Sequence, residues 1–391
     1  MIVRKFLLVV LAAGLYFCLS YASNKIGYSY FSLFNQDTTE KEDKKPGDDE
    51  NKIQVALLLD TSGSMSGLIE QTKSQLWNIL NELARTEKDK EETTLEIALY
   101  EYGNPTKAGN SNQINQLSAF TTDMDQISEK LFSLNTDGGD EYCGTVIQTS
   151  LEELEWSNKD GLRIIYIAGN EEFTQGMISY TSACKKAKEK GVTVNTIYCG
   201  EYGQGILEYW QAGAIAGGGE YLNINHNAET VYVKTPYDDQ INRLNFELNK
   251  TYIPIGAAGK VKQLNQISQD QNARVYSSTN AADRAVFKSS KKYKATDWDL
   301  ADAYKKDKSI LSNTAILPDT LQALSIEDLE AKILQISAQR ENIQQEIQTL
   351  DKKRRVYKTE QSKDDAEISL QNSMINSIKK QAKEKGFEIK E

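Results

Sequence analysis

The chain has 391 residues, 39% of them hydrophobic and 26% charged, a composition typical of a globular protein with two or three domains. Its formal net charge of −10 excludes nucleic-acid binding over the whole surface, and the most basic cluster, residues 288–294, is expected to be a solvated helix face. The single histidine, His226, disfavours His-based zinc sites and His–acid catalysis, so we expect a surface-loop role for it and no enzymatic activity.

The N-terminal segment is predicted to direct export. Arg4 and Lys5 precede an uncharged, largely apolar run from Phe6 to Tyr21. Residues 1–22 are therefore predicted to be either a cleaved signal peptide or a membrane anchor that uses residues 6–24. Both alternatives place the rest of the chain outside the cytoplasm, in the periplasm or at the cell surface, with a tether to the inner membrane if the segment is not cleaved. Residues 23–52 are rich in charges of both signs and are predicted to be a flexible linker.

Strand and helix patterns alternate from residue 53 onward. Nearly continuous apolar runs at 53–60, 162–169 and 192–200 are typical of strands buried on both faces, and segments with helical spacing separate them. This order predicts an α/β fold over residues 53–230: a doubly wound, mainly parallel sheet with helices on both faces. In such folds ligands bind at the carboxyl ends of the strands, which is where Asp60 stands.

The segment after the first strand resembles a known binding site. Asp-Thr-Ser-Gly-Ser at 60–64 is similar to the D-x-S-x-S loop of von Willebrand factor type A (vWA) domains, and residues 120–154 follow that family's order of helix, glycine- and acid-rich loop, and helix. The resemblance covers about residues 53 to 230. It implies a Rossmann-like vWA fold with a metal-ion-dependent adhesion site formed by Asp60, Ser62, Ser64 and Thr145. It further implies a divalent cation, Mg²⁺ before Mn²⁺ or Ca²⁺, and a protein partner that offers an acidic side chain to the ion.

The chemistry of these residue types agrees with the resemblance. A hard cation such as Mg²⁺ prefers six oxygen ligands, and one carboxylate with two or three hydroxyls supplies oxygens without cancelling the ion's charge. Asp60 and Ser62 could instead cap the following helix, since Asp and Ser are favoured N-cap residues. The two interpretations do not exclude each other.

The third loop departs from the family pattern. Where most vWA domains end the next buried strand with Thr-Asp-Gly, this chain has Ala168-Gly169-Asn170, so the aspartate position is occupied by Gly169. The loss raises the question of whether the site still binds metal. Other oxygen ligands close by in the sequence are Asn170, Glu171 and Glu172 in this loop, and Asp140 and Glu141 in the preceding loop.

Two cysteines are expected near the same sheet edge. Cys143 lies in the second loop and Cys199 ends the third buried strand, so a disulfide between them is possible in an oxidising compartment. The alternative is that both are buried thiols, as is expected for Cys184 on its helix.

The C-terminal part is predicted to be helical. Residues 231–320 are predicted to be a helical extension, and residues 321–391 a long helix, a helical hairpin or a coiled coil. An a/d heptad seam runs from Ile326 to Tyr357 and continues in phase to Ala382, with arginines at two seam positions, Arg340 and Arg354. Self-association through residues 326–382 and packing of the helix on its own domain both remain open.

These features favour an extracytoplasmic, adhesion-type protein-binding module that recognises its partner through a divalent-metal site. The alternative is a metal-independent scaffold that assembles through the C-terminal helices. The altered loop at Gly169 keeps this alternative open, since a domain that has lost its metal would have to act in another way.

Overall fold

The computed structural model describes residues 51–390 except 66–68, 70–76, 78, 90, 106–112, 225–232 and 362–365, and gives no side-chain environment for 366–374. The predicted signal peptide or anchor, nearly all of the predicted linker, and His226 lie outside the described residues. Among the helices that are described, none combines the length and hydrophobicity needed to cross a membrane.

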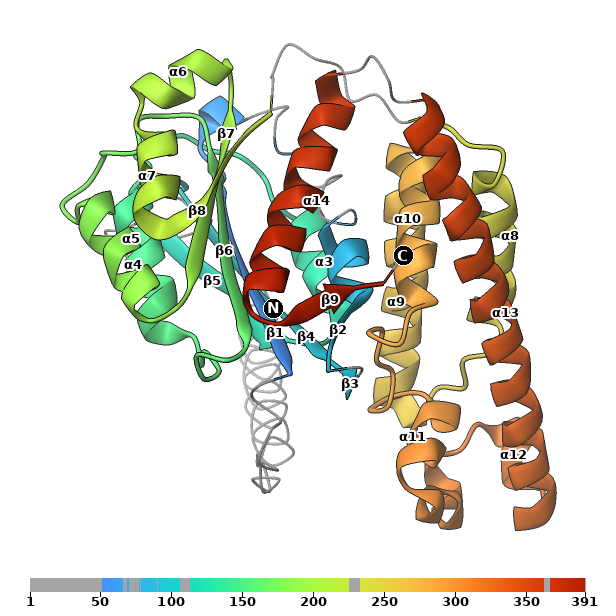
Figure 1. Ribbon diagram of the computed structural model, residues 1–391. Helices are drawn as coiled ribbons and strands as arrows, with labels where there is room; N and C mark the ends of the chain where they lie inside the picture. Colours follow the sequence, from blue (N-terminus) through green and yellow to red (C-terminus); the bar gives the residue numbers. More distant parts are fainter. Residues whose placement is uncertain are drawn as a thin grey trace, which may run out of the picture. The chain divides into compact units, whose positions relative to one another are not determined.

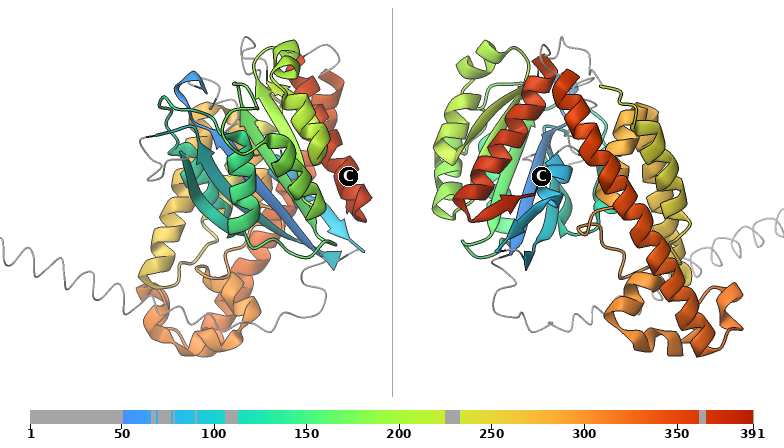
Figure 2. Two further views of the ribbon diagram at one scale, coloured as in Figure 1. Left: turned by 90° about the vertical axis from the view of Figure 1, so that its left-hand side faces the viewer. Right: turned by 45° about the vertical axis from the view of Figure 1, so that its right-hand side comes forward.

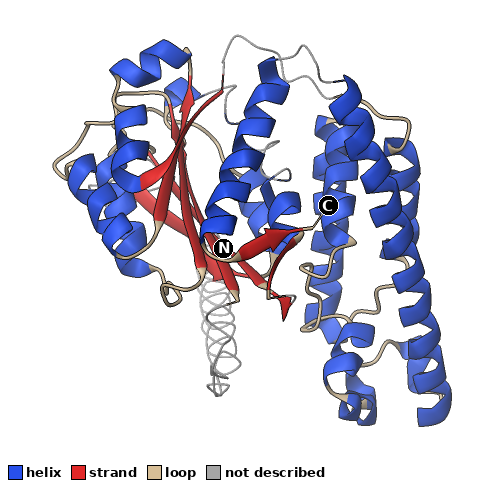
Figure 3. Cartoon of the chain, viewed as in Figure 1, coloured by secondary structure: helices blue, strands red, loops and turns tan. Residues whose placement is uncertain are grey.

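A six-stranded sheet forms the centre of the fold, with the strand order β5-β4-β1-β6-β7-β8 (Figures 1 and 3). The strands are β1 (Lys52–Asp60), β4 (Thr94–Tyr102), β5 (Ile114–Thr121), β6 (Leu162–Gly169), β7 (Thr193–Cys199) and β8 (Gly218–Ile224). Only the pairing of β4 with β5 is antiparallel. The doubly wound, mainly parallel α/β sheet predicted from the sequence is thus confirmed.

The sheet separates two hydrophobic cores because side chains along a strand alternate between its faces. On β1, Val55 and Leu57 enter one core, while Ala56 and Leu58 enter the other. The second core is closed by α4 (Cys143–Glu153), α5 (Tyr180–Glu189) and α7 (Trp210–Gly217). Every residue of β6 and all but the first of β1 and β7 are buried, which explains their continuous apolar sequence.

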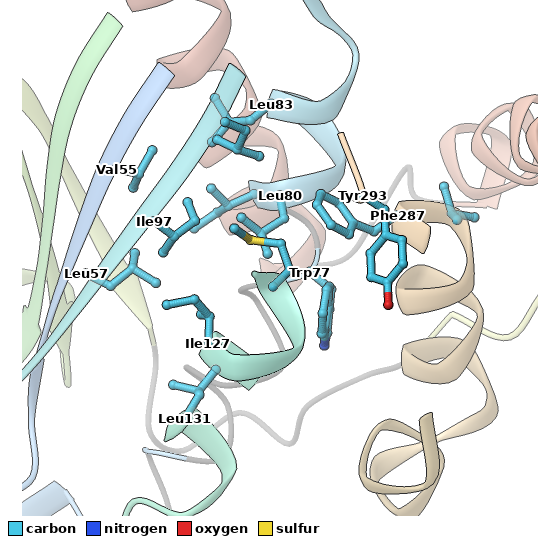
Figure 4. Packing of buried hydrophobic residues seen from close by; sticks show 14 of the residues in the cluster. Val55, Leu57, Trp77, Leu80, Leu83, Ile97, Ile127, Leu131, Phe287 and Tyr293 are labelled. Carbon is cyan, nitrogen blue, oxygen red and sulfur yellow. The ribbon is translucent and has the colours of Figure 1, made fainter. Parts of the chain in front are cut away.

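The first core joins the sheet to a second set of helices. The helical residues 79–84 and α3 (Met124–Phe132) lie directly on the sheet, and α10 (Ser278–Lys288) approaches from the far side. Figure 4 shows Trp77 and Leu80 between the strand residues Val55, Leu57 and Ile97 and the aromatic side chains of Phe287 and Tyr293. Residues far apart in sequence therefore share one continuous core.

Between β8 and α14 (Ala366–Glu384), the described residues form five further helices besides α10. They are α8 (Asp238–Asn249), α9 (Gly256–Tyr276), α11 (Leu300–Lys306), α12 (Asp319–Gln322) and α13 (Ile326–Gln361). Short 3-10 turns at Lys308–Ser312 and Thr314–Ile316 connect α11 to α12.

The heptad seam of α13 is buried against this same chain. Its apolar positions pack on α8, α10 and α11, and Ile333 and Ile347 are fully buried. The two seam arginines are paired there: Arg340 donates to both carboxylate oxygens of Asp299, at 2.7 and 3.0 Å. Packing of the helix on its own domain, one of the two alternatives, is therefore what the structure shows. Between Leu329 and Arg354 the structure therefore contradicts a coiled coil between chains through this seam, because most of its side chains there are buried, although Ile326 at its start is 58% exposed.

The end of the chain returns to the sheet. The helix α14 (Ala366–Glu384) packs against β8 and places Ile378 and Ala382 in the first core. The short strand β9 (Phe387–Ile389) then pairs antiparallel with β2 (Thr86–Lys88). On its other side β2 pairs antiparallel with β3 (Glu91–Glu92). Figure 2 shows α14 on the sheet and α13 on the helical layer.

Residues 49–391 consequently form one compact unit. The predicted boundaries at 231 and 321 mark changes in local structure. They do not separate independently packed domains, because the last 26 residues complete the core that begins at β1.

Candidate metal centre

The loop after β1 is fixed by hydrogen bonds at its start. The backbone N–H of Ser62 donates to Asp60 Oδ1 at 2.7 Å, and the N–H of Thr61 donates to the carbonyl of Tyr102 at 2.9 Å. A 3-10 turn, Gly63–Met65, follows, and the side chain of Met65 is buried in the first core. The loop is thus held at both ends, and Asp60, directly before it, is completely buried.

Asp60 uses only one of its two oxygens. Oδ1 accepts the hydrogen bond from Ser62, as a capping interpretation requires, but Oδ2 is buried and has no hydrogen-bond partner. Gly103, at φ +77°, allows this close packing, since a Cβ atom there would lie 2.8 Å from Oδ1. Capping alone therefore leaves one buried carboxylate oxygen unsatisfied, which is unfavourable without a ligand.

The two serines present their hydroxyls side by side. Ser62 Oγ lies 2.8 Å from Ser64 Oγ, and Ser64 Oγ donates to Asn170 Oδ1 at 2.9 Å. Ser62 is buried and Ser64 is exposed. Two hydroxyl oxygens and an amide oxygen thus meet at the carboxyl end of β1, as the sequence predicted for Ser62 and Ser64.

The second loop brings Glu141 close to Asp60. Glu141 is 2% exposed, its Oε1 atom has no partner, and its Cγ atom lies beside Gly103, as Asp60 Oδ1 does. Thr145 lies in the first turn of α4 and makes no side-chain hydrogen bond to any described residue. Asp140 points away: it is exposed and accepts a hydrogen bond from the Tyr142 hydroxyl at 3.1 Å.

The third loop places Asn170 beside Ser64 and Glu171 beside Gln175. Gln175 Nε2 donates to Glu171 Oε2 at 3.0 Å and lies 3.4 Å from Glu141 Oε2, so one amide bridges the two glutamates. The carbonyl of Glu171 accepts from Trp210 Nε1 at 2.6 Å, which fixes the loop on α7. Glu172 is exposed, and no described residue bonds to its side chain.

Gly169 cannot carry the aspartate of the family pattern in this protein. A Cβ atom at residue 169 would lie 2.7 Å from the Tyr102 hydroxyl and 2.8 Å from Trp210 Cη2. The space is therefore already filled by two aromatic side chains, and any ligand from this loop has to come from residue 170 or later.

Burial and like charge raise the pKa values of the two inner carboxyl groups. The pKa of Asp60 rises to about 7, mainly through burial and further through the charge of Glu171, against the hydrogen bonds from Ser62. The pKa of Glu141 rises to about 8 through burial and the neighbouring charges of Asp60 and Glu171. These shifts describe carboxylates packed together without a compensating cation.

The donor set fits a hard divalent cation. Carboxylate, hydroxyl and amide oxygens are the ligands that Mg²⁺, Mn²⁺ and Ca²⁺ prefer, and two inner oxygens are unpaired. Within the described parts of the chain, no three His, Cys, Asp or Glu side chains form a metal-binding group by themselves. An ion here would therefore depend on Ser62 and Ser64, and on water, as well as on carboxylates.

The predicted disulfide between Cys143 and Cys199 is wrong, since both cysteines are buried free thiols. Cys199 belongs to the first core and Cys143 to the second, so the sheet lies between them. The Cys143 thiol instead lies 3.8 Å from the Tyr102 hydroxyl, and burial raises its pKa. Cys184 is a buried free thiol, as expected.

One family model matches part of this chain. Residues 54–208 match the family model of the von Willebrand factor type A domain. No curated protein sequence matches the chain.

Three solved structures illustrate the similarity. The VWA domain of SpRpn10 is 16% identical, with 45% of this chain and 90% of that chain covered and a TM-score of 0.33. The protein BatB from Bacteroides thetaiotaomicron is 18% identical, with 44% and 90% covered and a TM-score of 0.32. Proximal thread matrix protein 1 from the mussel byssus, with a zinc-occupied MIDAS motif, is 10% identical, with 45% and 42% covered and a TM-score of 0.34.

Proposed function

We propose that this protein is a non-enzymatic, extracytoplasmic binding module that recognises a protein partner through a divalent-cation site at the carboxyl edge of its sheet. One observation carries the proposal. Asp60 Oδ2 and Glu141 Oε1 are both buried and both unpaired, and the two side chains meet at Gly103, where a Cβ atom would lie 2.8 Å from Asp60 Oδ1 and 3.2 Å from Glu141 Cγ.

A cation would resolve the electrostatic conflict at this position. Burial and the charge of Glu171 raise the pKa of Asp60, and burial and the charges of Asp60 and Glu171 raise the pKa of Glu141, so without a counter-charge the protonated site is favoured. A divalent ion would supply the missing positive charge and a Lewis-acidic contact point for a partner or water. Ser62, Ser64 and Asp60 would hold the ion, Glu141 would take the place that the family pattern gives to Thr145, and Gln175 would orient Glu141 and Glu171.

The identity of the ion and the location of the protein belong to the same proposal. Mg²⁺ is the first candidate because the hydroxyl-rich donor set leaves room for the waters that Mg²⁺ retains, with Mn²⁺ next and Ca²⁺ third. Export is supported by the positively charged and apolar N-terminal sequence. The acidic partner side chain implied by the family resemblance remains a prediction.

The scaffold alternative is less well supported. It required an exposed heptad seam between residues 326 and 382, and most apolar side chains and both arginines of the seam from Leu329 to Arg354 are buried within this chain. Assembly through another surface would still be compatible with a domain that binds no metal, and the following experiment separates the two functions.

Calorimetric titration of Mg²⁺ and Mn²⁺ into the chelator-stripped full chain tests the site. Saturable heat in the wild type is expected to vanish in the Ser62→Ala/Ser64→Ala variant. It should persist in Ser268→Ala/Ser312→Ala, two exposed serines on α9 and the 3-10 turn after α11 that bind no described residue through their side chains. No heat in the wild type, with the fold intact by circular dichroism, would overturn the metal site.

A further inference from the structure

The carboxyl edge of the sheet is strongly acidic. Its loops are described over residues 61–65, 103–105, 133–142, 170–179 and 200–210, and these stretches contain seven carboxyl side chains and neither lysine nor arginine. The seven are Asp137, Asp140, Glu141, Glu171, Glu172, Glu201 and Glu208. We call this set the acidic edge.

Three carboxylates of the acidic edge are bound by neutral groups. The glutamates and aspartate with resolved contacts accept hydrogen bonds from neutral groups: Tyr142 at Asp140, Gln175 at Glu171, and Gln204 at Glu208. Among the described residues, no lysine or arginine pairs with any of these three. The negative charge of these three carboxylates is therefore available to a partner.

Apolar side chains lie beside the acidic edge. Tyr202, Leu207 and Tyr209 are 55%, 73% and 45% exposed, and Met177 is fully exposed. Tyr202 and Leu207 begin and end α6 (Tyr202–Leu207), which follows the carboxyl end of β7 (Figure 1). We call these four residues the apolar rim.

Hydrogen bonds join the residues on either side of Tyr209 to the loop that carries Glu171 and Met177. The N–H of Phe173 donates to the carbonyl of Glu208 at 2.9 Å, and Trp210 Nε1 donates to the carbonyl of Glu171. Tyr209, between the two, has φ +68°, a left-handed conformation that is strained for a residue with a bulky side chain. The fold thus holds a tyrosine ring at the surface at some conformational cost.

From these observations we propose that the partner is a cationic protein segment that also carries apolar side chains, bound across the acidic edge and the apolar rim. Lysine or arginine side chains would meet the exposed carboxylates in charge-assisted hydrogen bonds, and apolar side chains would cover Tyr202, Leu207, Tyr209 and Met177. The inference deepens the proposed function by naming the partner's chemistry. It rests on that function only in using the same sheet edge.

Charge complementarity at this edge favours a cationic partner over an acidic one. A divalent cation bound at Asp60 and Glu141 would offset those two buried carboxylates and leave six acidic side chains around it. The two unpaired buried oxygens beneath this surface point to a positively charged occupant of the same edge. An approaching carboxylate would meet repulsion from Glu171 and Glu172, whereas a lysine or arginine would be attracted.

Three labelled 14-residue peptides serve as probes for the full chain: alternating Lys and Leu, alternating Glu and Leu, and alternating Lys and Ser. Fluorescence anisotropy is measured with Mg²⁺ and with EDTA. The Lys/Leu peptide is expected to bind, to weaken with rising salt, and to bind more tightly than the Lys/Ser peptide, while the Glu/Leu peptide should not bind. Binding of the Glu/Leu peptide in Mg²⁺ alone would overturn the inference in favour of an acidic partner.

Matched variants locate the binding. Asp137→Asn/Glu172→Gln is expected to weaken the Lys/Leu peptide about three- to tenfold, since exposed ion pairs contribute up to ~1 kcal/mol each. Glu327→Gln/Glu360→Gln, which removes two exposed carboxylates from α13, should leave affinity unchanged. Equal weakening by both variants would mean nonspecific attraction and would overturn the site.

The apolar contribution has its own control. Met177→Ser/Leu207→Ser should weaken the peptide, while Val261→Ser/Val275→Ser, two valines of α9 that are 66% and 84% exposed, should not. Metal-independent binding of the Lys/Leu peptide, with no heat on metal titration, would retain this inference and reject the cation in the proposed function. The two proposals can therefore fail separately.

Discussion

The hydroxyl of Tyr102 lies 2.7 Å from the position that a Cβ atom on residue 169 would occupy, so residue 169 cannot carry a side chain while Tyr102 keeps its position. The same hydroxyl donates to the carbonyl of Ala168 at 2.9 Å, which fixes the ring at the end of β6. Gly169 is thus a requirement of the packing around Tyr102 and Trp210.

Substitution of Gly169 tests this relationship. We expect Gly169→Ala to lower the free energy of unfolding by about 1–3 kcal/mol, as overpacking does in a filled core. Urea denaturation of the full chain measures the change. Gly138→Ala is the control, because a Cβ atom there meets no other atom within 4 Å. Equal stability of the two variants would show that the aromatic side chains yield to residue 169 at no cost.

The raised pKa of Asp60 predicts a pH dependence of stability in the absence of metal. Its folded-state pKa of about 7 lies above the usual value of 3.8, so folding favours the protonated form. The stabilisation is fully present below pH 4 and is lost as the pH rises through 7, by at most about 4 kcal/mol. Urea denaturation in EDTA at pH 5 and pH 8 should therefore show a larger loss in the wild type than in Asp60→Asn. The same loss in both would contradict the assignment.

Metal binding should have the opposite pH dependence. Because Asp60 and Glu141, with pKa values of about 7 and 8, must lose protons to bind a cation, Mg²⁺ affinity is expected to rise between pH 6 and pH 7. The increase is up to about tenfold per pH unit for each proton displaced. Calorimetry in buffers of different ionisation enthalpy counts those protons. Glu141→Gln should release fewer protons, and an unchanged count would exclude Glu141 from the site.

The buried arginine of α13 should be essential for stability. Arg354 donates to Asp238 at 2.6 Å and to Asp283, and all three side chains are largely buried. Arg354→Met would leave two carboxylates without their cation and is expected to lower the free energy of unfolding by about 3–5 kcal/mol. Lys353→Met, its exposed neighbour, is the control. Chemical denaturation compares the two, and a stable Arg354→Met would mean that Lys358, 3.7 Å from Asp283, compensates.

Local patterns were sufficient to predict the sheet and the first site loop. The run Leu162–Gly169 is one strand with the predicted bounds, because eight residues buried on both faces leave a continuous apolar signature. Asp60, Ser62 and Ser64 are adjacent in sequence, so the loop geometry that brings them together is largely local.

Contacts between distant segments could not be predicted in the same way. Whether Glu141 or Thr145 faces Asp60 depends on how the loop packs against Gly103 and Gln175, which lie 38 and 34 residues away in sequence. The face occupied by Cys199 depends on the strand's alternation and on which helices cover each side. A sequence signal for β9 is nearly absent, since three residues gain their structure only by pairing with β2.

The return of the C-terminus to the sheet has a consequence for biosynthesis. Ile378, Ala382 and Phe387 fill the same core as Val55 and Leu57, yet they are made long after the strands of the sheet. During translation, the sheet can pair its strands while the surface that α14 covers remains in contact with water. The nascent chain therefore exposes an apolar surface until α14 has been made, and a product truncated before α14 would expose that surface permanently to aggregation or proteolysis.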